Sequence, residues 1–184
     1  HRMRARISVL LTFLWRRLMI RTTVIAITGS VGKTTAKECL AAALEARGPV
    51  LRTFQNQNDR YGVPRTIRTM RPWHRFAVVE VGIRDPGDMR RLARLLKPDI
   101  AVVLRIARTH TDKFGSLENT APDKAALLSF LPRRGIPVLN PDDHTVRRSA
   151  NVNIPLTVLL RSPPLSDHPR APTGAHWPDR RLSR

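Results

Sequence analysis

The chain has 184 residues, of which 41% are hydrophobic, and its net charge is +19. This length and apolar content suit one globular domain and exclude a chain that is disordered throughout, and no stretch approaches the roughly 20 apolar residues that would span a membrane. The single cysteine, Cys39, cannot form an intrachain disulfide, which favours a reducing, cytoplasmic location and predicts a small core residue at this position.

Arginine supplies nearly all of the positive charge and is spread along the whole chain. A protein that binds nucleic acid or an anionic surface is one explanation for such a charge. Aromatic residues, on which single-stranded nucleic acid stacks, make up only 5% of the chain, so we favour arginine replacing lysine on solvated faces. The nucleic-acid alternative predicts binding that falls steeply with salt concentration.

The first segment, residues 1–21, carries several arginines and no acidic residue on either side of the apolar run 7–15. This run is too short to span a bilayer. Several interpretations are open: an amphipathic helix that rests weakly on a membrane surface or on a partner domain, a helix that packs on the core, or a remnant of a missing preceding domain. Arg16 and Arg17 follow the run where a signal peptide would need small residues, so a signal peptide is not expected.

The next segment combines a predicted strand, residues 24–27, with a glycine loop and the start of a helix. Backbone N–H groups of such a loop and the partial positive charge of the helix N-terminus bind phosphate. Lys33 would reach the outer phosphates of a nucleotide, and the Thr34 hydroxyl would ligate Mg²⁺. The spacing is shorter than the full pattern G-x-x-x-x-G-K-S/T, whose first glycine would fall at Ile27. The loop reads Thr28-Gly29-Ser30-Val31-Gly32-Lys33-Thr34-Thr35.

Strands and helices then alternate as far as residue 140. This alternation is typical of an α/β fold with a mostly parallel sheet flanked by helices, like that of P-loop NTPases. The predicted domains are a basic and apolar N-terminal helix (1–21), a nucleotide-binding domain (22–148) and a Pro/Arg-rich disordered tail (149–184), with one weak apolar run at 154–160. Further strands are predicted at 50–53, 76–82, 99–104 and 135–140, and helices at 33–47, 62–70, 85–97 and 120–131, the last with Thr120 as its N-cap and Pro122 in its first turn.

Several polar residues follow predicted strands. Asn56 and Asn58 stand in an amide-rich loop that either orients a ligand or is an ordinary polar loop. A carboxylate such as Glu80, at the end of a buried strand, is costly unless paired, and its partner is either an Mg²⁺ shared with Thr34 or one of the arginines. His110 follows the fourth strand, at the edge where open α/β sheets bind ligands.

In order and spacing, these blocks resemble the central ATP-binding domain of the Mur ligases over residues 22–146. Within that family, the chain is most similar to the members that add D-alanyl-D-alanine to UDP-MurNAc-tripeptide. The short glycine loop is that family's form of the phosphate site. The matching blocks are Thr28-Gly29-Ser30-x-Gly32-Lys33-Thr34-Thr35, Asn56-x-Asn58-Asp59, Gly62-Val63-Pro64-x-Thr66, Glu80-x-Gly82, Thr109-His110, Phe114-Gly115-Ser116, Lys124 and Leu139-Asn140-x-Asp142-Asp143.

The resemblance implies an ATP-dependent amide ligase of peptidoglycan precursor synthesis with ATP and Mg²⁺ as cofactors. ATP would phosphorylate a carboxylate, such as that of a UDP-MurNAc-peptide, and the amine of an amino acid or dipeptide would attack the acyl phosphate. By this resemblance the nucleotide contacts are Gly29, Ser30, Gly32, Lys33, Thr34, Thr35, Asn56 and Asn58. The metal ligands are Thr34 and Glu80 for one Mg²⁺ and His110 with a CO₂-modified Lys124 for the second, and the catalytic residues are Lys33, His110 and Lys124.

The chain departs from the family pattern near the second metal. Arg105 stands where the family usually has asparagine, and Ala126 stands where an acidic residue often follows the modified lysine. The resemblance ends near residue 146, without the remaining domains, so we expect a truncated member that binds Mg-ATP without necessarily completing ligation. The alternatives are a stand-alone ATP-binding or ATPase module, an inactive ligase fragment, and the basic nucleic-acid or anionic-surface binding protein.

Overall fold

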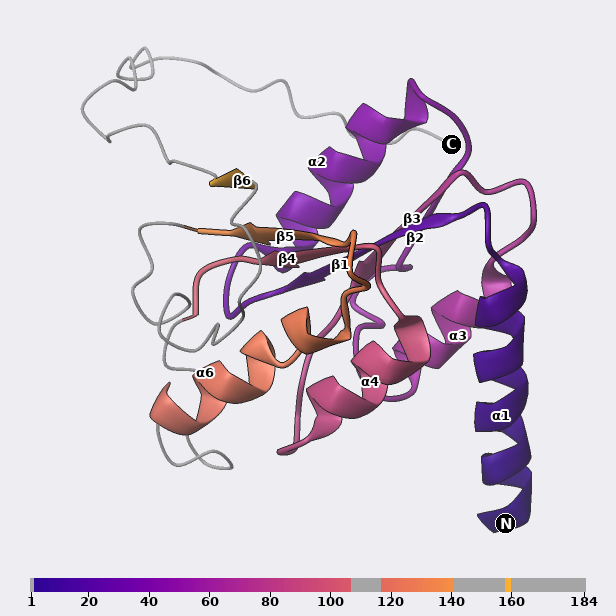
Figure 1. Cartoon of the computed structure of the whole chain (residues 1–184), viewed down its shortest axis with the longest axis horizontal. Helices are drawn as coiled ribbons and strands as arrows, with labels where there is room; N and C mark the ends of the chain where they lie inside the picture. The colour runs from indigo at the N-terminus through magenta and orange to yellow at the C-terminus, as the bar shows by residue number, and fades with distance from the viewer. Residues whose placement is uncertain (1, 107–116, 141–157, 160–184) are drawn as a thin grey trace, which may run out of the picture.

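The computed structural model of the chain describes residues 2–106, 117–140, 158 and 159 (Figure 1). Its centre is a six-stranded sheet in the order β2-β3-β1-β4-β5-β6, in which all neighbouring strands are parallel. The predicted α/β fold with a parallel sheet is therefore confirmed. The strands are β1 (Thr23–Thr28), β2 (Val50–Arg52), β3 (Phe76–Glu80), β4 (Ile100–Val103), β5 (Ile136–Leu139) and β6 (Val158–Leu159).

Helices cover both faces of the sheet. Figure 1 shows α2 on one face, α3, α4 and α6 on the other, and α1 at the outer side of α3 and α4. Such two-sided cover suits strands that are apolar along their whole length. The helices are α1 (Arg2–Leu18), α2 (Lys33–Glu45), α3 (Gly62–Thr69), α4 (Asp88–Leu96) and α6 (Leu117–Ala125), and a 3₁₀ turn, Leu128–Phe130, follows α6.

Strand β1 divides its side chains between two hydrophobic cores, because successive residues of a strand point to opposite faces. Val24 and Ala26 join the larger core, under α3, α4 and the segment after α6. Ile25 and Ile27 join a smaller core under α2. The central strand is thus fixed on both faces, and the loop that follows it starts from a rigid position.

Helix α1 packs on α3 and α4. Its buried Arg16 donates to the backbone oxygens of Leu96 (2.7 Å) and Lys97 (2.9 Å) at the end of α4, and it lies 3.6 Å from a carboxylate oxygen of Asp99. These bonds satisfy carbonyls that a helix C-terminus leaves without partners. Of the interpretations of residues 1–21, packing on the domain is confirmed for this face of the helix. Within the described ranges, no helix is long and apolar enough to cross a membrane.

Two sequence predictions about helices are wrong. Cys39 is exposed, because it lies across α2 from Lys37 and Ala41, which form the buried face of that helix. Helix α6 begins before Thr120 and includes Pro122 in its interior. A proline removes only one backbone N–H, and burial of the last residues of α6 holds the helix in place despite that loss.

The predicted weak apolar run 154–160 contains β6, which pairs with β5 through Val158 opposite Val138. The other residues of the predicted tail 149–184 lie outside the described ranges. The domain limits at 21 and 148 stay predictions.

Candidate functional site

The loops after β1, β3 and β4 meet at one edge of the sheet. Ile27 of β1 is in register with Glu80 of β3, and Thr28 of β1 is in register with Val103 of β4. Because all three strands are parallel and adjacent, their carboxyl ends lie side by side. Open α/β sheets bind ligands at this edge.

The glycine loop after β1 is packed against the end of β4. Gly29 has a φ of +152°, and a Cβ there would lie 2.9 Å from the Cβ of Leu104 and 3.3 Å from the backbone oxygen of Arg105. The next residue, Ser30, donates its N–H to that same oxygen at 2.8 Å. Gly32, with a φ of +81°, is in the left-handed conformation that turns the chain into α2. The loop therefore requires glycine for both space and conformation.

Lys33 opens α2 and curls back over the glycine loop. Its Nζ donates to the backbone oxygens of Gly29 (3.0 Å) and Ser30 (3.2 Å). Burial lowers the pKa of the Lys33 ammonium group, and the nearby charge of Glu80 partly opposes this effect. The ammonium group is thus half-buried beside the loop and close to a carboxylate.

Glu80 is almost fully buried and holds two site side chains together. The Thr34 hydroxyl donates to its Oε2 at 3.0 Å, and the Asn58 amide donates to its Oε1 at 2.7 Å. No ion pair among the described residues involves Glu80, so an arginine does not pair with it there. The structure therefore brings the predicted Thr34, Asn58 and Glu80 into one cluster.

Asn58 contacts Gly82 with both its backbone and its side chain. Its backbone oxygen accepts the N–H of Gly82 at 2.7 Å, and a Cβ on Gly82 would lie 2.8 Å from its Oδ1. Asn56, by contrast, is exposed, and its backbone oxygen accepts the N–H of Asn58 at 2.8 Å. Asn58 reaches the cluster with its side chain, whereas Asn56 supports the turn that positions it.

Lys124 joins the glycine loop from a part of the chain 94 residues away. Its Nζ donates to the hydroxyl oxygen of Ser30 at 2.8 Å, and the residue is only 3% exposed. Burial, with a contribution from the charge of Lys33, lowers the pKa of Lys124 to about 8. About a tenth of this side chain is therefore a neutral amine at pH 7, a far larger fraction than for a lysine with the ordinary pKa.

Sequence reasoning missed Lys37. This fully buried lysine donates to the backbone oxygens of Thr53 (2.9 Å) and Gln55 (2.8 Å), and its Nζ lies 2.9 Å from a carboxylate oxygen of Glu38. Lys37 ties α2 to the loop that carries Asn58. The available signal was its place on the same helical face as Ala41, where a lysine is unusual unless its ammonium group has buried partners.

The predicted second metal neighbourhood is only partly described. His110 lies outside the described residues, as do Thr109 and the segment 114–116. Arg105 is exposed, and Ala126 is buried in the larger core. Within the described ranges, no group of three or more His, Cys, Asp or Glu side chains could hold a metal ion. The roles assigned to His110 and Lys124 stay predictions.

The donor set fits a polyphosphate with a divalent cation. The hydroxyl of Thr34 and the carboxylate of Glu80 are adjacent hard oxygen donors, which Mg²⁺ prefers. Two lysines, Lys33 and Lys124, and the N-terminus of α2 supply positive charge at the same loop. The arrangement can bind phosphate oxygens and neutralise their charge.

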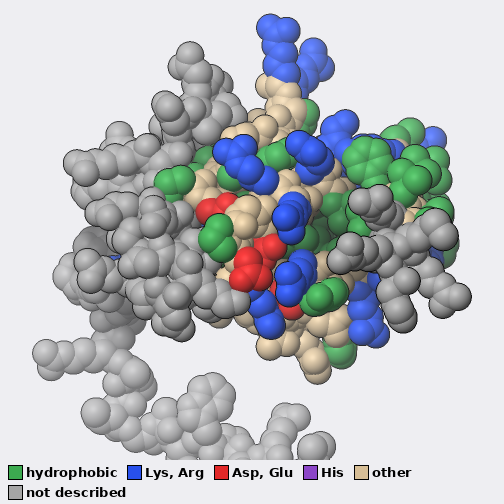
Figure 2. All heavy atoms as spheres, turned by 90° about the horizontal axis from the view of Figure 1, so that it is seen from below, with side chains coloured by type: hydrophobic (Ala, Val, Ile, Leu, Met, Phe, Trp, Pro, Cys, Tyr) green, Lys and Arg blue, Asp and Glu red, His purple; other side chains and the backbone are tan. Residues whose placement is uncertain are grey.

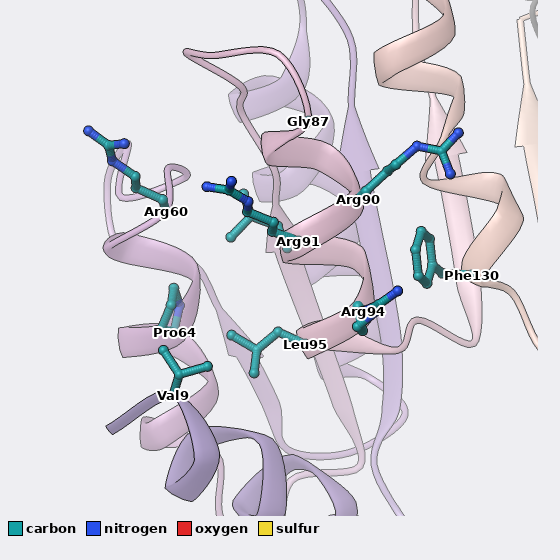
Figure 3. A pocket seen from close by; sticks show the side chains of 10 residues that line it. Val9, Arg60, Pro64, Gly87, Arg90, Arg91, Arg94, Leu95 and Phe130 are labelled. Carbon is teal, nitrogen blue, oxygen red and sulfur yellow. The ribbon is translucent and has the colours of Figure 1, made fainter. Parts of the chain in front are cut away.

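A separate hollow of about 590 Å³ lies over α4, between α1 and the segment after α6 (Figure 3). None of the predicted site residues lines it. In Figure 3, Arg60 and Arg91 lie on one side of α4, whereas Arg90 points to the other. Because these guanidinium groups do not converge, the hollow is not a single anion site, and the chemistry stays at the sheet edge.

Comparison with known proteins identifies the family of this domain. The family model described as the Mur ligase middle domain matches residues 27–159. The UDP-N-acetylmuramoyl-tripeptide–D-alanyl-D-alanine ligase of Escherichia coli is 38% identical over 130 residues, which are 71% of this chain and 29% of that protein. MurF from Acinetobacter baumannii has a TM-score of 0.74 and 29% identity, over 78% of this chain and 32% of that one.

The MurF ligase from Thermotoga maritima, solved in complex with ADP, has a TM-score of 0.69 and 30% identity, over 77% of this chain and 34% of that one. This chain thus spans about a third of the length of the relatives that it matches. The prediction that the resemblance ends near residue 146 is wrong, because the family match extends to residue 159 and takes in β6. The resemblance drawn from the sequence is confirmed: the chain belongs to the Mur ligase family, in the region of its middle domain.

Proposed function

We propose that this chain is the nucleotide-binding part of an ATP-dependent amide ligase of MurF type that acts in cytoplasmic peptidoglycan precursor synthesis. One observation carries the proposal: Lys33, Thr34 and Lys124 converge with Glu80 on a glycine loop at the carboxyl edge of a parallel sheet. The names of its relatives and the ADP bound to the Thermotoga maritima protein support it.

In this proposal each described side chain has a separate task. The backbone N–H groups at the start of α2 bind phosphate, and Lys33 donates to its outer oxygens once it leaves the loop carbonyls. Thr34 and Glu80 hold Mg²⁺, which neutralises phosphate charge when bound. Asn58 keeps the Glu80 carboxylate in the orientation that faces Thr34.

The ligation itself requires a carboxylate and an amine. A carboxylate is a poor electrophile until phosphorylation turns one of its oxygens into a leaving group. Attack by an amine on the acyl phosphate then forms the amide and releases phosphate, and ADP is the other product. We propose a UDP-MurNAc-tripeptide and D-alanyl-D-alanine as the pair, from the names of the relatives, and we expect the chain alone to bind Mg-ATP without completing this reaction.

Isothermal titration calorimetry of ATP with and without Mg²⁺ tests the nucleotide site. Lys33→Ala is expected to weaken Mg-ATP binding by at least about 100-fold, because it removes a charged donor to phosphate from a partly buried site. Arg91→Ala is the matched control, since it removes one positive charge from the exposed face of α4. Equal affinities of wild type and Lys33→Ala would contradict the proposal.

A simple ATPase is the second candidate, and product analysis separates it from a ligase. An ATPase releases ADP without a carboxylate or an amine, whereas the proposed ligase needs both when its remaining domains are supplied. The basic nucleic-acid binder predicts binding to single-stranded DNA that persists in Lys33→Ala and falls with salt.

Lys124 is proposed as the CO₂-modified ligand of a second Mg²⁺, together with His110. Only the neutral amine reacts with CO₂, giving a carbamate and a proton. The pKa of Lys124 is about 8. The carbamylated fraction of Lys124 should therefore rise as the pH increases through that value, whereas ordinary lysines require about pH 10. Carbon-13 NMR under a constant pressure of labelled CO₂ measures this. If the carbamate signal had the same size in Lys124→Arg, another amine would carry the modification, and Lys124 would not be the CO₂-modified ligand.

A further inference from the structure

Helix α1 docks on the domain through Phe13 and Trp15, which pack against the larger core, and through several polar side chains. Arg68 of α3 donates to the hydroxyl oxygens of Thr12 (3.1 Å) and Ser8 (3.4 Å), and the buried Arg16 reaches the end of α4. A surface helix ordinarily buries its apolar stripe and exposes its polar one. The other apolar residues of α1, which are exposed, are not explained by this packing.

Those apolar residues form a stripe on the outer face of α1. Their spacing places them on one side of the helix, across from Thr12 and Arg16. A hollow of about 460 Å³ runs along this side, with Trp15, Arg68 and Arg71 in its wall. The stripe, which we call the outer stripe, consists of Ile7 (51% exposed), Leu10 (56%), Leu11 (59%), Leu14 (49%) and Leu18 (67%).

Arginines flank the outer stripe on both sides. On one side, the guanidinium group of Arg17 lies 3.9 Å from the centre of the Phe13 ring. On the other, that of Arg71 lies 6.0 Å from the centre of a Trp15 ring. Residues 1–21 contain no acidic side chain. In Figure 2, apolar and basic side chains adjoin on the side of the molecule where α1 lies in Figure 1.

We propose that α1 lays the outer stripe into the surface of an anionic lipid bilayer. An apolar face between basic flanks is the arrangement of a helix that lies in the membrane interface, with leucines at the headgroup–acyl boundary and arginines on lipid phosphates. A second copy of the chain fits the stripe less well, because two such surfaces would bring their arginine flanks together in a protein whose net charge is +19. This inference does not depend on the proposed ligase activity.

Co-sedimentation of the full chain with vesicles tests the proposal. Binding is expected to vesicles of phosphatidylcholine and phosphatidylglycerol and not to phosphatidylcholine alone. The double variant Leu14→Gln, Leu18→Gln should bind the anionic vesicles at least about tenfold more weakly, because each change removes an apolar side chain from the interface. Phe54→Gln is the matched control, since Phe54 is 66% exposed outside α1, and it should bind like wild type.

Three results would overturn the proposal. The first is no binding to anionic vesicles at low salt. The second is equal binding of the double variant and wild type, which would assign the attraction to net charge alone. The third is a lipid-free dimer that the double variant disperses, which would make the stripe an interface between copies. If the first double variant melts at a lower temperature than wild type, a second pair, Ile7→Gln with Leu10→Gln, repeats the test.

Discussion

Gly62→Ala is expected to lower the free energy of unfolding by about 3 kcal/mol or more, because the added Cβ would overlap the backbone carbonyl group of Gln57. The clash is with backbone, so no side-chain rotation relieves it. Gly62 also donates its N–H to a carboxylate oxygen of Asp59 at 2.9 Å, so a shift at the start of α3 would disturb that turn too. Thermal unfolding should show a melting temperature lower by roughly 6–12 °C for a chain of this size.

Gly87→Ala provides the comparison for this prediction. Gly87 has a φ of +83°, but a Cβ there would meet no atom within 4 Å. Its cost is therefore backbone strain alone, about 1 kcal/mol. If both variants melted at similar temperatures, the overlap at Gly62 would have been overestimated and the loop before α3 would be able to move as a unit.

Local patterns in the sequence predicted most of the fold. Each strand of the sheet centre is a short apolar run, and turn residues such as Gly48 and Pro98 separate it from a helix. The errors come from features that local rules do not see. Cys39 is apolar enough for a core, but the face of α2 that packs on the sheet is the one that carries Lys37 and Ala41, so Cys39 faces away from it. A proline such as Pro122 usually marks a helix start, but here it lies inside α6, whose last residues are buried.

The candidate site was predictable to different degrees. The meeting of Thr34 and Glu80 follows from chemistry, because a buried carboxylate needs a partner and parallel strands bring their ends together. The contact of Lys124 with Ser30 joins distant segments, and only the resemblance to a known family pointed to it. Lys37 was missed because its partners are backbone oxygens, which no side-chain pattern reveals.

Lys37→Met is expected to lower the free energy of unfolding by about 2–3 kcal/mol, although methionine fills a similar volume. The substitution leaves the backbone oxygens of Thr53 and Gln55 without their charged donor, and each such loss costs about 1–3 kcal/mol. Relief from burying an ammonium group offsets part of this cost. Urea unfolding measures the difference.

The same substitution should also loosen the loop that carries Asn58. Gln55 has a φ of +49°, a conformation that costs a residue with a side chain about 1 kcal/mol and that its bond to Lys37 helps to hold. Without that bond, we expect faster hydrogen exchange at Gln57 and Asn58 and weaker Mg-ATP binding through the displaced Asn58–Glu80 contact.

Glu38→Gln separates the buried bonds of Lys37 from its ion pair. The Glu38 side chain is 49% exposed, and solvent weakens an ion pair made by an exposed carboxylate, so this variant should unfold close to wild type and keep slow exchange in the loop. If Lys37→Met were as stable as wild type but its loop amides exchanged faster, the Lys37 ammonium group would position the loop without contributing to the stability of the fold. If it matched wild type in both, the loop would be held by Asn58 and Gly82 alone, and Lys37 would have no part in positioning the site.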